Sequence, residues 1–213
     1  ETAAQMFGVI AEAGIVPLAR VPSNSHENIK RCLDNGAFGI VVPMVNTAEE
    51  ARAAVAATKY HPEGNRSVGG SLHCLNFGVP APEYYAEASN EIFVAVQTEH
   101  IEAVKNAEEI CAVPGVDAIF VGPNDLLQSM GKTPGMESDD QEFIDAMNHL
   151  RETALKHGVA PGLHTLLPEQ LRRRIDEGWT FLALGSDVAL MLQGAKNSLR
   201  EAGIGEGGES ARY

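Results

Sequence analysis

The sequence predicts an α/β fold of parallel strands, with about six of the eight βα units of a (β/α)8 barrel. Three observations support this prediction. β-branched runs alternate with helix-like stretches along the chain. The runs 92–99 and 116–122 are largely apolar, as in strands buried on both faces of a sheet. An acid closes the first run at Glu99, and Asp125 follows the second. An open doubly wound sheet would give the same alternation and remains an alternative at this stage.

The individual elements follow from composition and from capping residues. Gly14 and Gly36 end the first two helices. Thr47 and Glu50 have the spacing of a capping box at the start of the third helix. The predicted strands are 15–20, 38–44, 92–99, 116–122, 159–163 and 180–185. The predicted helices are 2–13, 28–35, 47–58, 82–89, 101–111, 139–157, 168–177 and 187–202.

Two segments fall outside this alternation. The stretch 60–82 is rich in Gly, Pro, Asn and Ser and is predicted to be a long irregular loop. The tail 203–213 is rich in Gly and Glu and is predicted to be frayed, leaving 1–202 as one barrel domain. The chain opens directly on a helix-like pattern without a cap, so we expect it to begin inside a larger domain.

Composition and charge limit the classes of function. The chain has 213 residues, with 44% hydrophobic and 21% charged residues, which is ordinary for a globular protein. A net charge of −13 argues against a general nucleic-acid binder. No apolar run reaches the roughly 20 residues that span a bilayer. The scattered cysteines Cys32, Cys74 and Cys111 indicate free thiols and a cytoplasmic location.

The two strand-end acids predict a metal site. Parallel strands joined by a helix place their carboxyl ends at the same edge of a sheet, so Glu99 and Asp125 should converge. Two carboxylate ligands with open coordination positions suit Mg²⁺ or Mn²⁺. Capping of the following helices is the structural alternative for both acids.

Several motifs together resemble the HpcH/HpaI aldolase family, which is related to the citrate lyase β subunit. The matching segments keep the family order from near residue 1 to about residue 200. They are Ala19-Arg20-Val21-Pro22, Leu33-Asp34-Asn35-Gly36-Ala37, Val42-Pro43-Met44-Val45, Pro62-Glu63-Gly64-Asn65-Arg66, Val96-Gln97-Thr98-Glu99, Phe120-Val121-Gly122-Pro123-Asn124-Asp125-Leu126 and Leu184-Gly185-Ser186-Asp187.

The resemblance implies a (β/α)8 barrel in a hexamer, arranged as a trimer of dimers or a dimer of trimers. It implies that Glu99 and Asp125 bind a divalent cation (Mg²⁺, Mn²⁺ or Co²⁺), with Gln97 beside it. Arg20 corresponds to the family arginine at the reaction centre, and Asp34 to an acid that reaches a neighbouring subunit's active site.

Other residues are candidates from their positions alone. The turn before Asn124 can direct the backbone N–H groups of Asn124 and Asp125 at a carboxylate. Leu190 follows the last strand and is expected to border the pocket. His164 should face the barrel mouth, where a contact with the second substrate is one alternative. We expect His73 to be a solvated loop histidine, and the run 172–174 to be a solvated basic face.

The sequence departs from the family pattern in two ways. Thr98 and His100 flank Glu99 where the family has Ile and Ser or Thr. The family's catalytic histidine lies in an Asp-x-Glu-His-Gly motif on the second strand, and no segment of the printed sequence matches it. We therefore expect the first two barrel strands to be absent from the chain as given.

These observations predict a metal-dependent class II aldolase. It would cleave a 4-hydroxy-2-oxo acid reversibly into pyruvate and an aldehyde, through a metal-stabilised pyruvate enolate. Its partners would be small molecules and further copies of the chain, with no nucleic acid and no membrane. The alternatives are a citrate or acyl-CoA lyase or synthase of the same superfamily, or a non-catalytic fragment without the base strand.

Overall fold

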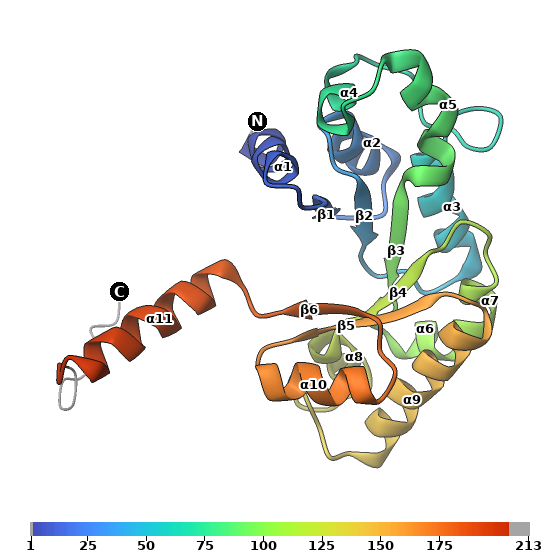
Figure 1. Ribbon diagram of the computed structural model, residues 1–213. Helices are drawn as coiled ribbons and strands as arrows, with labels where there is room; N and C mark the ends of the chain where they lie inside the picture. The colour runs from blue at the N-terminus through green and yellow to red at the C-terminus, as the bar shows by residue number, and fades with distance from the viewer. Residues whose placement is uncertain (1, 205–213) are drawn as a thin grey trace.

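One curled parallel sheet organises the molecule (Figure 1). The computed structural model describes residues 2–204. The strands are β1 (Leu18–Arg20), β2 (Gly39–Val42), β3 (Phe93–Gln97), β4 (Ala118–Val121), β5 (Ala160–Thr165) and β6 (Phe181–Leu184). They pair in the order β1-β2-β3-β4-β5-β6, all parallel. A doubly wound sheet reverses its strand order, whereas this sequential order is that of a barrel wall, so six parallel strands of a partial barrel are present.

The curl of the sheet is visible in contacts between strands that are not neighbours. The rings of Phe93 in β3 and Phe181 in β6 have centroids 5.1 Å apart, and Phe120 in β4 lies 5.6 Å from Phe181. In a flat sheet, strands three positions apart would be separated by about 14 Å. Gly162 in β5 makes room, because a Cβ there would lie 2.8 Å from the Phe181 ring. The six strands therefore form a curled half-barrel with a concave inner face.

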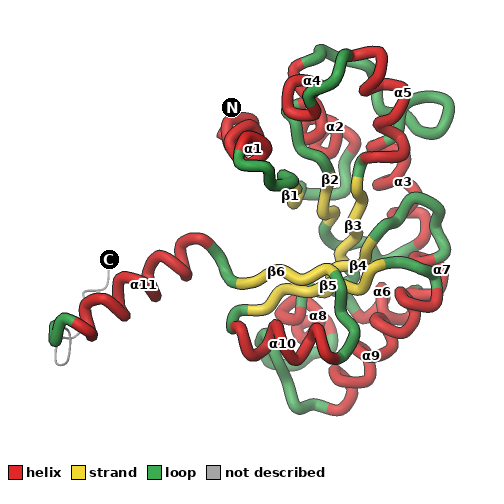
Figure 2. Tube along the Cα trace, viewed as in Figure 1, coloured by secondary structure: helices red, strands yellow, loops and turns green. Residues whose placement is uncertain are grey.

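Helices connect the strands, and all except the first and the last lie around the convex side of the sheet (Figure 2). They are α1 (Thr2–Glu12), α2 (His26–Asp34), α3 (Ala48–Thr58), α4 (Leu72–Phe77), α5 (Ala81–Glu91), α6 (Ile101–Lys105), α7 (Ala107–Cys111), α8 (Pro123–Ser129), α9 (Gln141–Lys156), α10 (Pro168–Asp176) and α11 (Asp187–Glu201). The core lies between these helices and the sheet, where Leu33, Ile40, Ile119 and Leu150 are fully buried. The predicted alternation and most of the predicted ranges agree with these elements.

Three local predictions were wrong or incomplete. The stretch 60–82 is not wholly irregular, because α4 forms within it. The helix predicted over 101–111 is broken at Asn106, whose Nδ2 donates to the Asn46 carbonyl at 2.8 Å. The short helix α8 was not predicted as an element, since its seven residues are too few to show a helical pattern.

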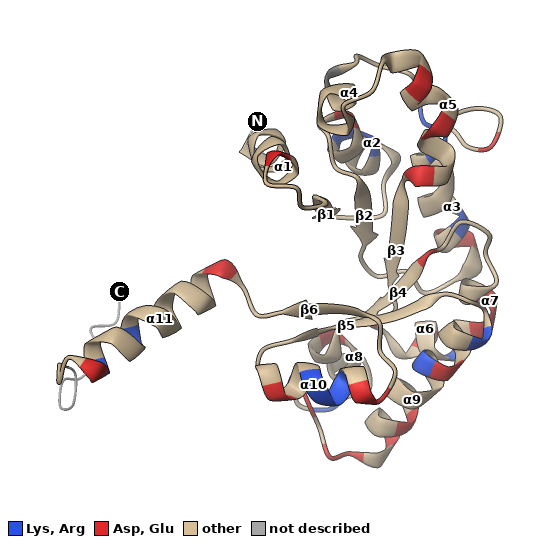
Figure 3. Ribbon diagram, viewed as in Figure 1, with Lys and Arg blue, Asp and Glu red and all other residues tan. Residues whose placement is uncertain are grey.

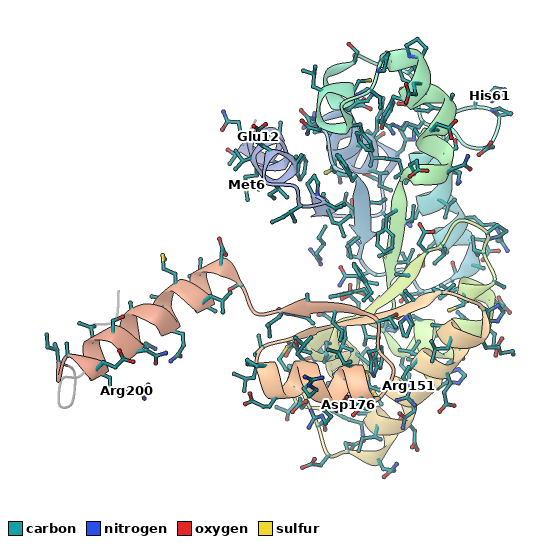
Figure 4. The ribbon with its side chains drawn as sticks, viewed as in Figure 1. Met6, Glu12, His61, Arg151, Asp176 and Arg200 are labelled. Carbon is teal, nitrogen blue, oxygen red and sulfur yellow. The ribbon has the colours of Figure 1, made fainter. Side chains whose placement is uncertain are left out.

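Two helices stand apart from the sheet (Figure 4). Met6 marks α1 and Arg200 marks α11 in that view. Helix α1 still buries Phe7 and contacts α4, whereas α11 buries none of its residues. Of the predicted tail 203–213, residues 205–213 lie outside the described part of the chain. Within residues 2–204, no helix has the length and apolarity needed to cross a membrane.

The arginine run on α10 is not a free basic face (Figure 3). Arg174 pairs with Glu177 at 2.8 Å and is only 14% exposed, and Arg173 pairs with Glu137. The predicted solvated position is therefore wrong for Arg174, which pairs with Glu177 just after α10. Arg173 is 51% exposed, as predicted, although Glu137 in the loop before α9 neutralises its charge.

Replacing Thr47 tests the capping box of α3. Thr47 Oγ1 accepts a hydrogen bond from the Glu50 N–H at 3.2 Å, and Glu50 Oε2 accepts one from the Thr47 N–H at 3.1 Å. We expect Thr47→Ala to lower the free energy of unfolding by about 1 kcal/mol, because a helical N–H loses its acceptor. Urea denaturation measures this change. Thr47→Ser keeps the hydroxyl and is the control; equal losses in both variants would contradict the explanation.

Candidate active site

The carboxyl ends of the strands surround a cavity of about 540 Å³ on the concave face. Five of the residues predicted from the sequence line it: Arg20, Gln97, Glu99, Asn124 and Asp125. His164 lines the same cavity from β5. Apolar residues of the inner face, including Leu18, Val41, Phe120 and Phe181, form the rest of the wall. The structure thus brings the two strand-end acids to one place.

A chain of hydrogen bonds fixes the acid of β3. Arg20 Nε donates to Gln97 Oε1 at 2.8 Å, and Gln97 Nε2 donates to Glu99 Oε2 at 2.9 Å. Because the Gln97 oxygen is held by Arg20, its amide nitrogen must face Glu99. The backbone N–H of Met44 donates to the other carboxylate oxygen at 3.0 Å. Met44 has φ 54°, the only positive φ of a non-glycine residue within 2–204.

The Glu99 carboxylate is buried and only partly compensated. Glu99 is 2% exposed. Burial is the largest effect and raises the pKa of its carboxyl; the negative charge of Asp125 raises this pKa further, while the Met44 N–H and the Arg20 charge lower it. The net increase means that the surroundings stabilise the charge of Glu99 less well than water does. A cation placed between Glu99 and Asp125 would remove this deficit.

Gly122 allows the backbone to approach Glu99 closely. A Cβ at position 122 would lie 2.4 Å from Glu99 Oε2 and 3.2 Å from Glu99 Cβ. The φ of −97° at Gly122 is accessible to any residue, so the requirement for glycine is space rather than backbone conformation. The turn that leads into α8 therefore packs directly against the buried carboxylate.

Asn124 and Asp125 lie in the first turn of α8, and both are exposed. The first N–H groups of a helix have no partner within the helix and remain available to a ligand. Asp125 lines the cavity from the helix that follows β4, and Glu99 lines it from the end of the neighbouring strand β3.

The donor set fits a hard divalent cation. Two carboxylates are present, and no group of three or more His, Cys, Asp or Glu side chains suited to a metal occurs in residues 2–204. Oxygen ligands and remaining open positions match the preferences of Mg²⁺ and Mn²⁺. The buried, destabilised Glu99 charge is the structural observation that supports a cation at this place.

Asp34 and Leu190 do not line this cavity within one chain. Asp34 ends α2 and forms ion pairs with Lys30 and with Arg66, whose Nη2 lies 2.8 Å from Asp34 Oδ1. Leu190 is 63% exposed on α11, which projects from the sheet (Figure 1). A role for either residue in the site would require a second subunit.

Arg66 forms the centre of a second, buried cluster. Its side chain is fully buried between Tyr60 and Tyr84, with the guanidinium carbon 4.7 Å from the Tyr60 ring centroid, and it donates to the Tyr84 hydroxyl at 3.1 Å. The prediction of a solvated His73 was wrong, because His73 is 1% exposed and packs 4.4 Å from the Tyr84 ring centroid. This cluster attaches the segment 60–82 to α2 through the ion pair of Arg66 with Asp34.

The sequence did not indicate two features of the site. The Met44 N–H and the bare Cα of Gly122 both contact Glu99, yet neither carries a reactive side chain. Both residues occur in segments that resemble the family, but their contacts with Glu99 are made by the backbone at the ends of neighbouring strands and could not be found from spacing.

A family model and a curated relative both place this chain among aldolases and lyases. The family model described as HpcH/HpaI aldolase/citrate lyase matches residues 1–194. A 5-keto-4-deoxy-D-glucarate aldolase of Escherichia coli O6:H1 (strain CFT073) is 39% identical over 174 residues, covering 82% of this chain and 67% of the relative.

Solved structures agree with this result. An HpcH/HpaI aldolase/citrate lyase family protein from Burkholderia cenocepacia J2315 superposes with a TM-score of 0.85 at 30% identity, covering 94% of this chain and 79% of that protein. An HpcH/HpaI aldolase from Desulfitobacterium hafniense DCB-2 gives a TM-score of 0.84 at 29% identity, covering 97% of this chain and 80% of that protein.

Gly122→Ala tests the close approach to Glu99. The added methyl group would displace the carboxylate, so we expect Mn²⁺ affinity to fall about 10- to 100-fold while the fold is kept. Isothermal titration of Mn²⁺ measures the affinity. Gly194→Ala is the control, because a Cβ there has nothing within 4 Å. Equal affinities for Gly122→Ala and the parent chain would contradict the assignment.

The raised pKa of Glu99 predicts that protons and metal compete. Metal binding needs the ionised carboxylate, so Mn²⁺ affinity should fall as the pH is lowered, beginning above the ordinary glutamate range of about 4.3. The folding stability of the metal-free protein depends on pH in the opposite direction. The stability that protonated Glu99 contributes is present at low pH and is lost as the pH rises through the raised pKa of Glu99. Mn²⁺ titrations over a pH series measure the effect; an affinity that stays constant down to the ordinary range would refute it.

Proposed function

Since this chain belongs to the HpcH/HpaI aldolase/citrate lyase family, it is a carbon–carbon lyase, and we propose that it cleaves a 4-hydroxy-2-oxo acid reversibly into pyruvate and an aldehyde. The observation that carries this proposal is the linked set of Arg20, Gln97 and the buried Glu99, with Asp125 beside them in one cavity. The aldolase name of the 39% identical relative favours the aldol reaction.

We propose that Glu99 and Asp125 hold a divalent cation, Mg²⁺, Mn²⁺ or Co²⁺. Such a cation supplies Lewis acidity to the 2-oxo group of the substrate. The chain's own contribution is to bury and orient the carboxylates: Met44 and Gln97 each donate to one oxygen of Glu99, which prevents its rotation. Asn124 and Asp125 would offer backbone N–H groups to the substrate carboxylate.

Arg20 is the proposed electrostatic catalyst. Its Nε is used by Gln97, so the two terminal nitrogens of the guanidinium remain for the substrate. Cleavage transfers the electron pair of the C3–C4 bond toward the 2-oxo oxygen, and a fixed positive charge there lowers the barrier. The 4-hydroxyl gives its proton to solvent water as the aldehyde forms, and C3 of the enolate takes up a proton from solvent to give pyruvate.

Gln97 acts mainly by positioning its neighbours. Both polar atoms of its side-chain amide form hydrogen bonds: the oxygen accepts one from Arg20, and the nitrogen donates one to Glu99. One N–H of the amide remains free to contact the pyruvate carboxylate. Gln97 thereby couples the orientation of the proposed metal ligand to that of the proposed catalyst.

We further propose that the chain works as a homo-oligomer, with Asp34 reaching the cavity of a neighbouring copy. The apolar side chains that α11 exposes, Leu190, Met191 and Leu192 at 63%, 66% and 52%, support contacts between copies. Sedimentation velocity tests this assembly, and the hexamer is the expected species; a monomer at micromolar concentration would count against it.

The reaction itself is tested with pyruvate, an aldehyde and Mn²⁺. We expect a 4-hydroxy-2-oxo acid to form, EDTA to stop its formation, and the methyl protons of pyruvate to exchange with D₂O when Mn²⁺ is present. Glu99→Ala should remove Mn²⁺ binding together with both activities. Product that forms equally well in EDTA, or Mn²⁺ affinity unchanged in Glu99→Ala, would reject the proposal.

Arg20→Lys separates catalysis from folding. A lysine cannot donate to Gln97 and to the substrate through one planar group, so we expect kcat to fall at least about 100-fold, comparable to removing one donor to a developing oxyanion. The free energy of unfolding should change by less than about 1 kcal/mol, since Arg20 is exposed. Steady-state kinetics and urea denaturation measure both quantities. Arg52→Lys, at an exposed ion pair on α3, is the control.

A further inference from the structure

His164 lies in the wall of the cavity at the end away from Arg20. It belongs to β5, opposite Ala183 of β6, and it is half-buried. Arg20 lies on β1, Glu99 follows β3, and Asp125 follows β4. A ligand whose 2-oxo acid end lies at Arg20, Glu99 and Asp125 would therefore direct its remaining carbons toward β5 and His164.

One hydrogen bond determines the tautomer of this histidine. His164 Nε2 lies 3.0 Å from the Gly185 carbonyl oxygen. A carbonyl oxygen can only accept, so Nε2 carries the proton and Nδ1 of the uncharged ring holds a free lone pair. Among the described residues no group hydrogen-bonds Nδ1, and Nδ1 is not among the enclosed polar atoms that lack a partner. Nδ1 is therefore an acceptor that is open to a ligand.

The Gly185 carbonyl, which accepts the hydrogen bond from His164, is itself held in place by the fold. Gly185 has φ 58°, a left-handed conformation that favours glycine, and its N–H donates to the Thr165 carbonyl at 2.7 Å. Ser186, the next residue, caps α11 through its Oγ. The junction between β6 and α11 thus directs the Gly185 carbonyl at the His164 ring.

We propose that His164 Nδ1 accepts a hydrogen bond from a hydroxyl group in the aldehyde half of the substrate and so selects hydroxylated aldehydes. This inference rests on the proposed aldolase function. A neutral acceptor beside apolar residues such as Phe181 and Leu182 favours a hydroxyl group over an alkyl group, which would leave Nδ1 without a partner.

Two substitutions separate the two nitrogens of the ring. His164→Gln places a donor near the position of Nε2, so the bond to Gly185 can persist while the Nδ1 acceptor is lost. His164→Asn places an oxygen near the position of Nδ1 and gives up the bond to Gly185. A merely structural role, exerted through the bond to Gly185, would be kept in His164→Gln and lost in His164→Asn, whereas the proposed contact requires the opposite pattern.

The test measures binding to the Mn²⁺-loaded full chain with two ligands that cannot be cleaved, because both lack the 4-hydroxyl. These ligands are 5-hydroxy-2-oxopentanoate and 2-oxopentanoate, and pyruvate is the reference ligand. We expect the parent chain to bind the hydroxylated ligand roughly tenfold more tightly, as one additional hydrogen bond allows. The ratio of the two affinities, hydroxylated ligand over 2-oxopentanoate, should fall to about 1 in His164→Gln and stay well above 1 in His164→Asn.

The outcomes distinguish this inference from the proposed function. If pyruvate binds in an Mn²⁺-dependent manner but the parent ratio is near 1, or is unchanged in His164→Gln, the assignment of His164 is wrong and the aldolase proposal stands. If pyruvate shows no Mn²⁺-dependent binding, the proposed function fails and the role of His164 fails with it.

Discussion

The burial of one carboxylate is the constraint to which the rest of the site conforms. Glu99 is removed from water at the end of β3, and a buried charge is costly unless it is hydrogen-bonded and compensated. Gln97 and the Met44 backbone donate to its two oxygens, Arg20 supplies a nearby positive charge, and Gly122 leaves the space that the carboxylate needs. These contacts come from β1, the β2–α3 connection, β3 and the turn before α8, so the site forms only when four parts of the chain are in register.

Much of the fold and part of the site followed from the sequence. Apolar runs such as that of β4 indicate a strand of a buried parallel sheet, because a strand that is buried on both faces shows no alternation of polar and apolar residues. The convergence of Glu99 and Asp125 followed from the geometry of parallel strands, and the capping box at Thr47 from the spacing of two residues. The choice between a barrel wall and a doubly wound sheet required the strand order itself.

The remaining features depend on contacts between distant segments, which no local pattern encodes. His73 looks like a solvated loop residue in the sequence, yet aromatic rings of α5 and Tyr60 bury both His73 and Arg66. A buried guanidinium requires a partner, and Asp34 on α2 provides it. Leu190 follows the last strand by only a few residues, but the direction that α11 takes from the sheet decides which surface it meets.

The left-handed backbone at Met44 suggests a route to engineering this protein. A non-glycine residue in that conformation carries roughly 1 kcal/mol of strain, and here the strained unit is the one that directs an N–H at Glu99. The side chain of Met44 is 46% exposed, so its chemistry can be changed with little disturbance of the interior. Asparagine tolerates this conformation and keeps the N–H, which makes position 44 a place to gain thermal tolerance without altering a single group that meets the substrate.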